Sequence, residues 1–255
     1  MTAFESVIED IARWLENRRP AKDVMCLGIA GAQGSGKTTL ATELADHMNR
    51  QGLTTCTLSL DDFYRTRAER EALARELHPL FRTRGVPGSH DMKLMLEAMR
   101  SLQQGNETQV PVFDKAADDR CRDWRTIPAG QEFVIIEGWC WGARPASGED
   151  LLDPINELEA KRDPDGTWRK AVNSFLAEDG YQRAFAATDA LLFLVVPDFD
   201  AVFRWRLQQE QELSPGEVNR VMDDAGVREF IMHYERISRR MLRDLPGRAD
   251  ISLRL

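Results

Sequence analysis

The feature that most constrains this chain is the segment Gly31-Ala-Gln-Gly-Ser-Gly-Lys-Thr38, a full match to the pattern GxxxxGK[ST]. It directly follows an apolar run at 24–30 and precedes a stretch of helical periodicity. Glycines let such a loop curl so that its N–H groups point at phosphate oxygens, and the helix N-terminus adds partial positive charge. We therefore predict a nucleotide-binding phosphate loop, made by Gly31, Ala32, Gln33, Gly34, Ser35, Gly36, Lys37, Thr38 and Thr39.

The loop pattern also assigns individual roles. We expect Lys37 to reach the β and γ phosphates of ATP, and the Thr38 hydroxyl to bind Mg²⁺. Kinases, GTPases and motor ATPases share such a loop, so the motif does not say what happens to the γ phosphate. A GTPase needs an NKxD-type guanine motif after a later strand, where this chain instead reads Val196-Pro-Asp-Phe-Asp200. The sequence therefore disfavours a GTPase.

Short apolar runs rich in β-branched residues alternate with longer segments of helical period. This alternation is typical of a parallel sheet that is covered on both faces. We predict an α/β fold with a mostly parallel five-stranded sheet and helices on both faces. The phosphate loop makes this the three-layer P-loop NTPase class, and membership of that class implies the strand order 2-3-1-4-5. The expected strands are 24–30, 54–60, 133–136, 191–196 and 251–255, and the expected helices include 38–49, 65–77 and 91–103.

The organisation of the chain favours a single domain over residues 1–255, because no long linker of Pro, Gly or Ser interrupts it. About 70 residues lie between the second and third expected strands, far more than an ordinary crossover needs. We interpret residues 61–131 as a substrate-binding insertion.

Charge and composition exclude several classes. With 34 basic and 42 acidic residues the net charge is -8, which disfavours nucleic-acid binding. The four cysteines show no CxxC spacing, so a reducing, cytoplasmic setting is expected. The first ten residues carry acids where a signal peptide carries bases, and no apolar run approaches the roughly 20 residues that span a bilayer. We expect no membrane partner; the sequence is silent on oligomeric state.

Adjacent carboxylates, Asp61 and Asp62, follow the second expected strand. Ligands gather at the carboxyl ends of parallel strands, so this pair is expected near the phosphate loop. One carboxylate can accept the proton of an attacking hydroxyl, and the other can assist the metal shell. Alternatively, Asp62 caps the helix expected at 65–77.

The third expected strand delivers a further acid, Glu137, as a Walker B strand does. Glu137 is then placed to hold Mg²⁺, directly or through a water, or to order the phosphate loop. The segment 138–145 after it is aromatic and rich in glycine, which suits either a loop that closes over a small ligand or a packed connection with buried tryptophans. Arg144 is its best candidate for contacting an anion.

The insertion supplies charge in segments 82–91 and 111–120. Arginines beside glycines in irregular structure suggest a cup for a small anionic or polyhydroxyl substrate. A solvated surface loop is the alternative interpretation. His90 is weak support for a site, because a histidine at a helix start is often part of the cap.

A family resemblance rests on several short motifs in order: Asp61-Asp-Phe-Tyr64, Arg84-Gly-x-x-Gly-Ser-His-Asp91, Pro111-x-Phe-Asp-Lys115, Glu137-Gly-Trp-x-x-Gly142 and Trp205-Arg-Leu-Gln-x-Glu210. Together with the phosphate loop they resemble the D-glycerate 3-kinases of plants and fungi and their bacterial relatives. These enzymes belong to the phosphoribulokinase/uridine kinase group of P-loop kinases.

The resemblance implies transfer of phosphate from ATP, with Mg²⁺, to a small hydroxyl acceptor, D-glycerate to 3-phosphoglycerate being the best single guess. It makes Asp61 the expected base, with Lys37, Glu137 and Arg206 as further catalytic residues. Residues 199–220 resemble a lid, in which Arg206 is favoured over Arg204 to point inward. The candidate acceptor-binding residues are Asp62, Tyr64, Arg84, His90, Asp114, Lys115, Arg120, Trp139 and Arg144.

Rival functions remain open from the sequence. A kinase of a nucleoside, pantothenate or a sugar phosphate is the nearest, and Trp139 and Trp141 keep a base-stacking slot conceivable. A nucleotide switch or acceptor-free ATPase would need an exposed partner surface and no acceptor pocket.

Overall fold

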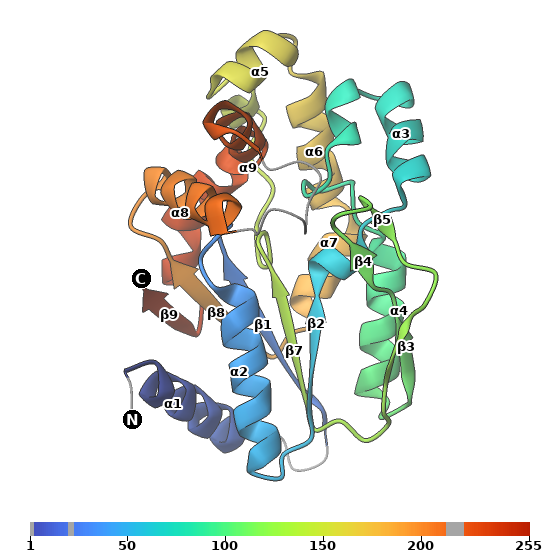
Figure 1. Cartoon of the computed structure of the whole chain (residues 1–255), viewed down its shortest axis with the longest axis vertical. Coiled ribbons are helices and arrows are strands. Elements are labelled where there is room, and N and C mark those ends of the chain that lie inside the picture. Colours follow the sequence, from blue (N-terminus) through green and yellow to red (C-terminus); the bar gives the residue numbers. More distant parts are fainter. Residues whose placement is uncertain (1–2, 20–22, 213–221) are drawn as a thin grey trace.

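A central parallel sheet organises the computed structural model, which describes residues 3–19, 23–212 and 222–255 (Figure 1). The strand order is β2-β7-β1-β8-β9, and every pairing is parallel. The insertion takes the labels β3 to β6, so within the five sheet strands this is the predicted order 2-3-1-4-5. The strands are β1 (Met25–Gly31), β2 (Thr55–Ser59), β7 (Phe133–Gly138), β8 (Ala190–Val195) and β9 (Ile251–Arg254).

One face of the sheet is covered by α1 (Ala3–Arg18) and α2 (Lys37–Arg50). Leu15 and Leu44 from these helices pack with Leu27 and Ile29 of β1, and all four are buried. The opposite face carries α4 (Met92–Gln103) and α7 (Asp179–Ala186) (Figure 1). The central strands β1 and β7 are buried along their whole length, because helices cover both faces.

The insertion between β2 and β7 lies along the outer edge of the sheet. It contains two small antiparallel ribbons, β3 with β6 and β4 with β5. Its helix α4 places Met95 and Met99 in the core, so the methionine stripe packs rather than forming a special surface. Its elements are η1 (Leu60–Phe63), α3 (Arg67–Glu76), η2 (Pro79–Arg82), α4, β3 (Thr108–Val110), β4 (Phe113–Asp114), β5 (Asp119–Arg120) and β6 (Arg125–Ile127).

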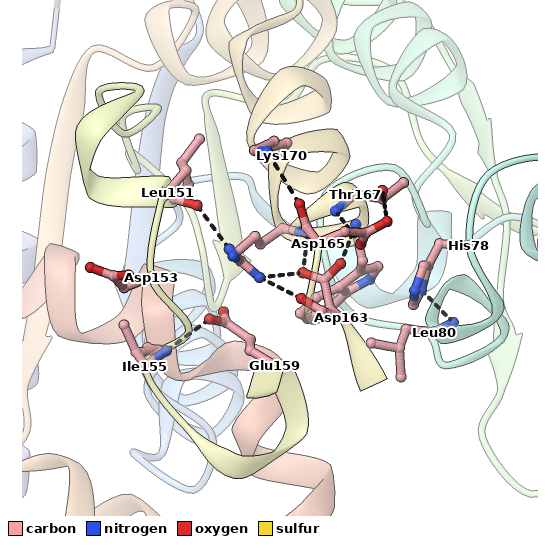
Figure 2. A network of polar contacts seen from close by, with 12 residues as sticks. His78, Leu80, Leu151, Asp153, Ile155, Glu159, Asp163, Asp165, Thr167 and Lys170 are labelled. Atoms are coloured by element: carbon pink, nitrogen blue, oxygen red, sulfur yellow. Dashed lines mark hydrogen bonds and ion pairs between the residues drawn. The ribbon is translucent and has the colours of Figure 1, made fainter. Parts of the chain in front are cut away.

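The segment after β7 forms a helical layer above the carboxyl edge of the sheet (Figure 1). Asp163, fully buried, fixes the connection between two of its helices by pairing with Arg169 at 3.0 Å and accepting from the Trp168 N–H at 2.7 Å. Figure 2 shows the polar contacts around Asp163 and the neighbouring Asp165–Thr167 turn. The layer contains η3 (Glu149–Leu151), α5 (Glu157–Arg162), α6 (Thr167–Ala177), α8 (Phe199–Glu212) and α9 (Asp224–Asp244), and η4 (Leu245–Gly247) follows α9 and contacts β8.

None of the helices formed by the described residues is both long enough and apolar enough to cross a membrane.

Candidate active site

The phosphate loop lies at the carboxyl edge of the sheet, between β1 and α2. Gly34 and Gly36 have φ of 77° and 82°, in the left-handed region that glycine adopts without strain. Gly36 is the N-cap of α2, and within the described chain no side chain accepts a hydrogen bond there as a cap. The first N–H groups of α2 are therefore left for an anion.

A cavity of about 250 Å³ lies beside this loop, between the sheet edge, the insertion and the helical layer. The loop contributes residues from Gln33 to Thr39 to its wall. Outside the loop the cavity is lined by Asp61, Tyr64, Arg84, Lys115, Glu137, Trp139, Arg206, Phe230 and Tyr234. The structure therefore brings the predicted base and four of the nine predicted acceptor residues beside the phosphate loop.

The polar groups of the loop fit a polyphosphate. Lys37 donates from Nζ to the Ala32 carbonyl at 3.0 Å, which folds its ammonium back over the loop. Burial lowers the pKa of Lys37, and the nearby Glu137 and Asp61 only partly oppose this effect. Among the described residues, the buried Ser35 hydroxyl has no hydrogen-bond partner. A phosphate bound beside Lys37, which lines the cavity, would supply a negative charge next to its buried ammonium.

The oxygen groups beside the loop fit a magnesium ion. The buried Glu137 accepts at Oε1 from the Thr38 hydroxyl at 3.0 Å and from the Ser59 hydroxyl at 2.6 Å. Carboxylate and hydroxyl oxygens suit Mg²⁺, which keeps several waters and few protein ligands. The described residues contain no group of three or more His, Cys, Asp or Glu that could hold a metal ion. The sequence interpretation missed Ser59 as a partner of Glu137. Its position at the end of β2, opposite Glu137 in the parallel register of β2 and β7, was the signal that could have identified it.

Asp61 lies on the other side of the cavity, in the short 3-10 turn η1 after β2. Its Oδ1 accepts from the Tyr64 hydroxyl at 2.8 Å, and its Oδ2 pairs with Lys115 Nζ at 2.9 Å. Burial alone would raise the pKa of Asp61, but the Lys115 charge and these hydrogen bonds outweigh it and hold the pKa at about 2. The carboxylate is therefore ionised at neutral pH, as a base must be.

Asp62 faces a different part of the molecule. Its Oδ1 accepts from the Phe113 N–H of β4 at 3.3 Å, and burial raises its pKa. Asp62 is not among the residues that line the cavity, and the expectation that it caps the following helix is wrong. The cap of α3 is Thr66, which forms a capping box with Glu69. Because η1 turns the chain between the two acids, they point toward different partners.

The predicted acceptor residues Arg84 and Lys115 both line the cavity. Arg84 pairs with Asp118 and also donates from Nη2 to the Lys115 carbonyl at 3.5 Å. Asp118 is held on its other side by the buried Arg70 at 3.0 Å. Two cationic side chains thus stand in the same cavity as Asp61 and the phosphate loop.

Aromatic residues form the remaining wall. Trp139 donates from Nε1 to the Gly85 carbonyl at 2.7 Å, and the Tyr234 hydroxyl donates to the Arg84 carbonyl at 2.9 Å. The Trp139 and Tyr234 rings meet edge to face at 5.0 Å. Sequence reasoning missed Tyr234 and Phe230, because α9 lies about 150 residues beyond Arg84 and carries no motif that links it to the site.

His90 does not contact the cavity as predicted but supports one of its walls. It is 1% exposed and stacks on the Tyr64 ring at 4.7 Å. Its Nδ1 is 2.7 Å from the Tyr181 hydroxyl. Burial lowers the pKa of His90 to about 3, so the ring is neutral at physiological pH. The cap of α4 is the neighbouring Asp91, which accepts from the Leu94 N–H at 3.1 Å.

Three other predicted acceptor residues are not among those that line the cavity. Asp114 accepts from the N–H groups of Ala116 and Ala117, which shapes the turn between β4 and β5. Arg120 donates to the Tyr64 carbonyl at 2.8 Å and lies 3.6 Å from Asp91. Arg144 is exposed and lines a separate small cavity against α6 and α9. Each was predicted from its place in or beside a short motif, which does not give the direction of a side chain.

The segment 138–145 is a packed connection, which settles the two alternatives for it. Trp139 and Trp141 are both buried, and Trp141 meets Phe185 edge to face at 5.0 Å. The interpretation of this segment as a closing loop is therefore wrong.

The lid-like region coincides in part with α8. Arg206 lines the cavity and pairs with Glu210, whereas Arg204 is exposed beside Asp198. The preference for Arg206 over Arg204 agrees with this placement. Residues 213–220 of the predicted lid lie outside the described residues.

This arrangement defines a class of protein. A phosphate loop, an acid on the neighbouring strand, and a carboxylate with cations across the cavity are the parts of a P-loop phosphotransferase. The model of the phosphoribulokinase / uridine kinase family matches residues 26–145. A Schizosaccharomyces pombe protein, the uncharacterized kinase mug58, is 33% identical over 248 residues, covering 92% of the chain and 87% of that relative. The chain therefore belongs to the phosphoribulokinase/uridine kinase family.

Two further relatives refine the likeness. The chloroplastic D-glycerate 3-kinase of Arabidopsis thaliana is 30% identical over 231 residues, which cover 82% of this chain and 46% of that protein. The chain thus spans about half the length of this relative. The solved D-glycerate 3-kinase from Cryptococcus neoformans superposes with a TM-score of 0.76 at 24% identity, covering 95% of this chain and 90% of that one. The sequence-based assignment to a phosphotransferase with an alcohol acceptor is confirmed.

Proposed function

We propose that the protein transfers the γ phosphate of ATP, with Mg²⁺, to a hydroxyl group of a small hydroxy acid. D-glycerate is the best single candidate, with 3-phosphoglycerate as product. The observation that carries the proposal is one cavity in which the phosphate loop and Asp61 share the walls with Arg84 and Lys115. The cations match an acceptor carboxylate, and the D-glycerate 3-kinase relatives point to the same substrate.

In this mechanism the protein mainly positions the reactants and offsets charge. The loop N–H groups and Lys37 hold the phosphates, and Arg206 approaches them from α8. Asp61 accepts the proton of the acceptor hydroxyl. At the same time the hydroxyl oxygen bonds to the γ phosphorus, and the bond between the γ phosphorus and the β–γ bridging oxygen breaks. When Mg²⁺ is bound at Thr38 and Glu137, it neutralises charge on the phosphates.

The burial of the two tryptophans gives the nucleoside alternative less support. A base-stacking slot made by them would need an accessible indole face, and Trp141 is fully buried in the core. Trp139 is 4% exposed, with its N–H used by Gly85.

ADP release measured with a panel of acceptors tests the function. We expect strong stimulation by D-glycerate and weaker or no stimulation by glycerol, uridine and pantothenate. Steady hydrolysis of ATP without an acceptor, with no stimulation by any hydroxyl compound, would contradict the kinase proposal. In the same assay Asp61→Asn should lose about 100-fold or more of the transfer rate while still binding ATP. An active Asp61→Asn enzyme would place the base elsewhere.

A further inference from the structure

The oxygens of the Asp61 carboxylate have unequal partners. Oδ1 is bound by the hydroxyl of Tyr64, which is buried and stacked on His90. Oδ2 is bound by Lys115, whose side chain is 65% exposed. The Tyr64 contact is therefore fixed by packing, whereas the Lys115 contact can be exchanged. The proton-accepting oxygen is then Oδ2, and in this structure Lys115 covers it.

The backbone that carries Lys115 is held firmly even though its side chain is exposed. Lys115 follows β4, and its carbonyl accepts from Arg84. Asp118, across the same turn, is held by both Arg84 and Arg70. A flexible four-carbon side chain on an anchored backbone can swing its ammonium over a short range without moving the turn.

We propose that Lys115 is a specificity-determining residue that covers the base Asp61 until a negatively charged acceptor draws it away. This inference rests on the proposed function, because it assumes that Asp61 serves as the base for transfer to a small acid. Two consequences follow. Acceptor-free hydrolysis of ATP is suppressed, and neutral hydroxyl compounds are poor acceptors.

The preference for a negatively charged acceptor follows because Lys115 exchanges one ion-pair partner for another. An acceptor carboxylate can replace Asp61 as the partner of Lys115, so the ammonium keeps a counter-charge when Oδ2 is uncovered. A neutral acceptor such as glycerol offers no such replacement, and Lys115 then stays on Asp61. Arg84 is a weaker candidate for this role, because its guanidinium is already paired with Asp118.

The suppressed side reaction is hydrolysis. With Oδ2 uncovered, a water molecule gives a proton to Asp61 while the water oxygen bonds to the γ phosphorus. The bond to the β–γ bridging oxygen breaks, ADP and inorganic phosphate leave, and Asp61 returns the proton to solvent.

Lys115→Met tests the proposal, since it removes the charge and retains much of the side-chain length. ADP release is measured without an acceptor, with D-glycerate and with glycerol. We expect acceptor-free hydrolysis to rise about tenfold, because the uncovered carboxylate can then act on water. The KM for D-glycerate should rise, and the preference for D-glycerate over glycerol should fall. Lys115→Arg keeps the charge and should restore low hydrolysis.

Controls separate this effect from others. Lys93→Met changes an exposed lysine of α4 and should leave every rate as in the wild type. The double variant Lys115→Met/Asp61→Asn should lose the extra hydrolysis, because it lacks the uncovered base. If Lys115→Met hydrolyses ATP no faster than the wild type while the wild type phosphorylates D-glycerate, the covering role is wrong and the kinase stands. If the wild type phosphorylates no acceptor, the proposed function itself fails.

Discussion

The phosphate loop and the acceptor side of the cavity are built in different ways. The loop is one continuous segment whose ligands are mainly backbone N–H groups, set by glycine conformations and the start of α2. The acceptor side is assembled from side chains of η1, the turn after β4, β7, α8 and α9, which lie far apart in the sequence. A backbone site tolerates little change within the loop, whereas the acceptor side can be altered one side chain at a time.

The acceptor side also mixes two kinds of charged residue. Arg84 and Lys115 line the cavity, while Arg70 and Arg120 bind backbone carbonyls and hold the walls. The charged residues of the insertion therefore include both those that line the site and those that hold its walls in place. Variants can separate these roles, because loss of a lining residue affects KM and loss of a scaffold residue affects stability.

The largest effect is expected on the loop side. Lys37→Met should lower kcat on the order of 1000-fold for every acceptor, because a buried cation then no longer offsets the negative charge of the phosphates. The KM for D-glycerate should change little, since Lys37 belongs to the loop. Steady-state kinetics with two acceptors measures both. A loss of kcat that differed between the two acceptors would contradict the division between the loop side and the acceptor side.

A matched pair of arginines sharpens the comparison within the insertion. Arg84→Ala should raise the KM for D-glycerate roughly 10-fold to 100-fold, with little change in Tm, because Arg70 still holds Asp118.

Arg120→Ala is the scaffold member of this pair. It should lower stability by about 1–3 kcal/mol, because the Tyr64 carbonyl and Asp91 lose a mostly buried partner. Acceptor KM and urea unfolding are measured for both variants. The opposite pattern, with KM changed in Arg120→Ala and stability lost in Arg84→Ala, would reverse the assignment of the two residues.

The smallest effect concerns the packed wall behind Tyr64. Burial lowers the pKa of His90 from 6.5 to about 3, so the unfolded chain binds a proton that the folded chain does not as the pH falls below 6.5. His90 should therefore cost the fold about 2 kcal/mol between pH 7.5 and pH 5. Urea unfolding of wild type and His90→Gln at both pH values measures this. The variant should be less stable at pH 7.5 but lose less on acidification; equal losses would contradict the buried neutral histidine.

The fold and the loop could be predicted from the sequence because their signals are local. Apolar runs predicted the sheet strands, the glycine pattern predicted the loop, and the fold class that the loop indicates predicted the strand order. Strand ends and short motifs also predicted that Asp61, Glu137 and Lys115 lie near the loop, and all three line the cavity, while their roles stay predictions. Such placements can be predicted where position along the chain nearly determines position in space.

The rest depends on side-chain direction and on distant contacts. Asp62, His90 and Arg120 stand within or beside the predicted motifs, yet they face Phe113, Tyr181 and Tyr64. Tyr234 reaches the site only through the packing of α9 against the insertion, and no local pattern marks it. Such contacts emerge from tertiary packing, which a single sequence does not display.

The fate of the γ phosphate tests the central claim most directly. Phosphorus NMR of wild-type protein with ATP, Mg²⁺ and D-glycerate should show ADP and a new phosphomonoester in equal amounts, with little inorganic phosphate. Omitting D-glycerate should leave the ATP largely intact. ADP and inorganic phosphate formed at the same rate with or without D-glycerate would contradict the account.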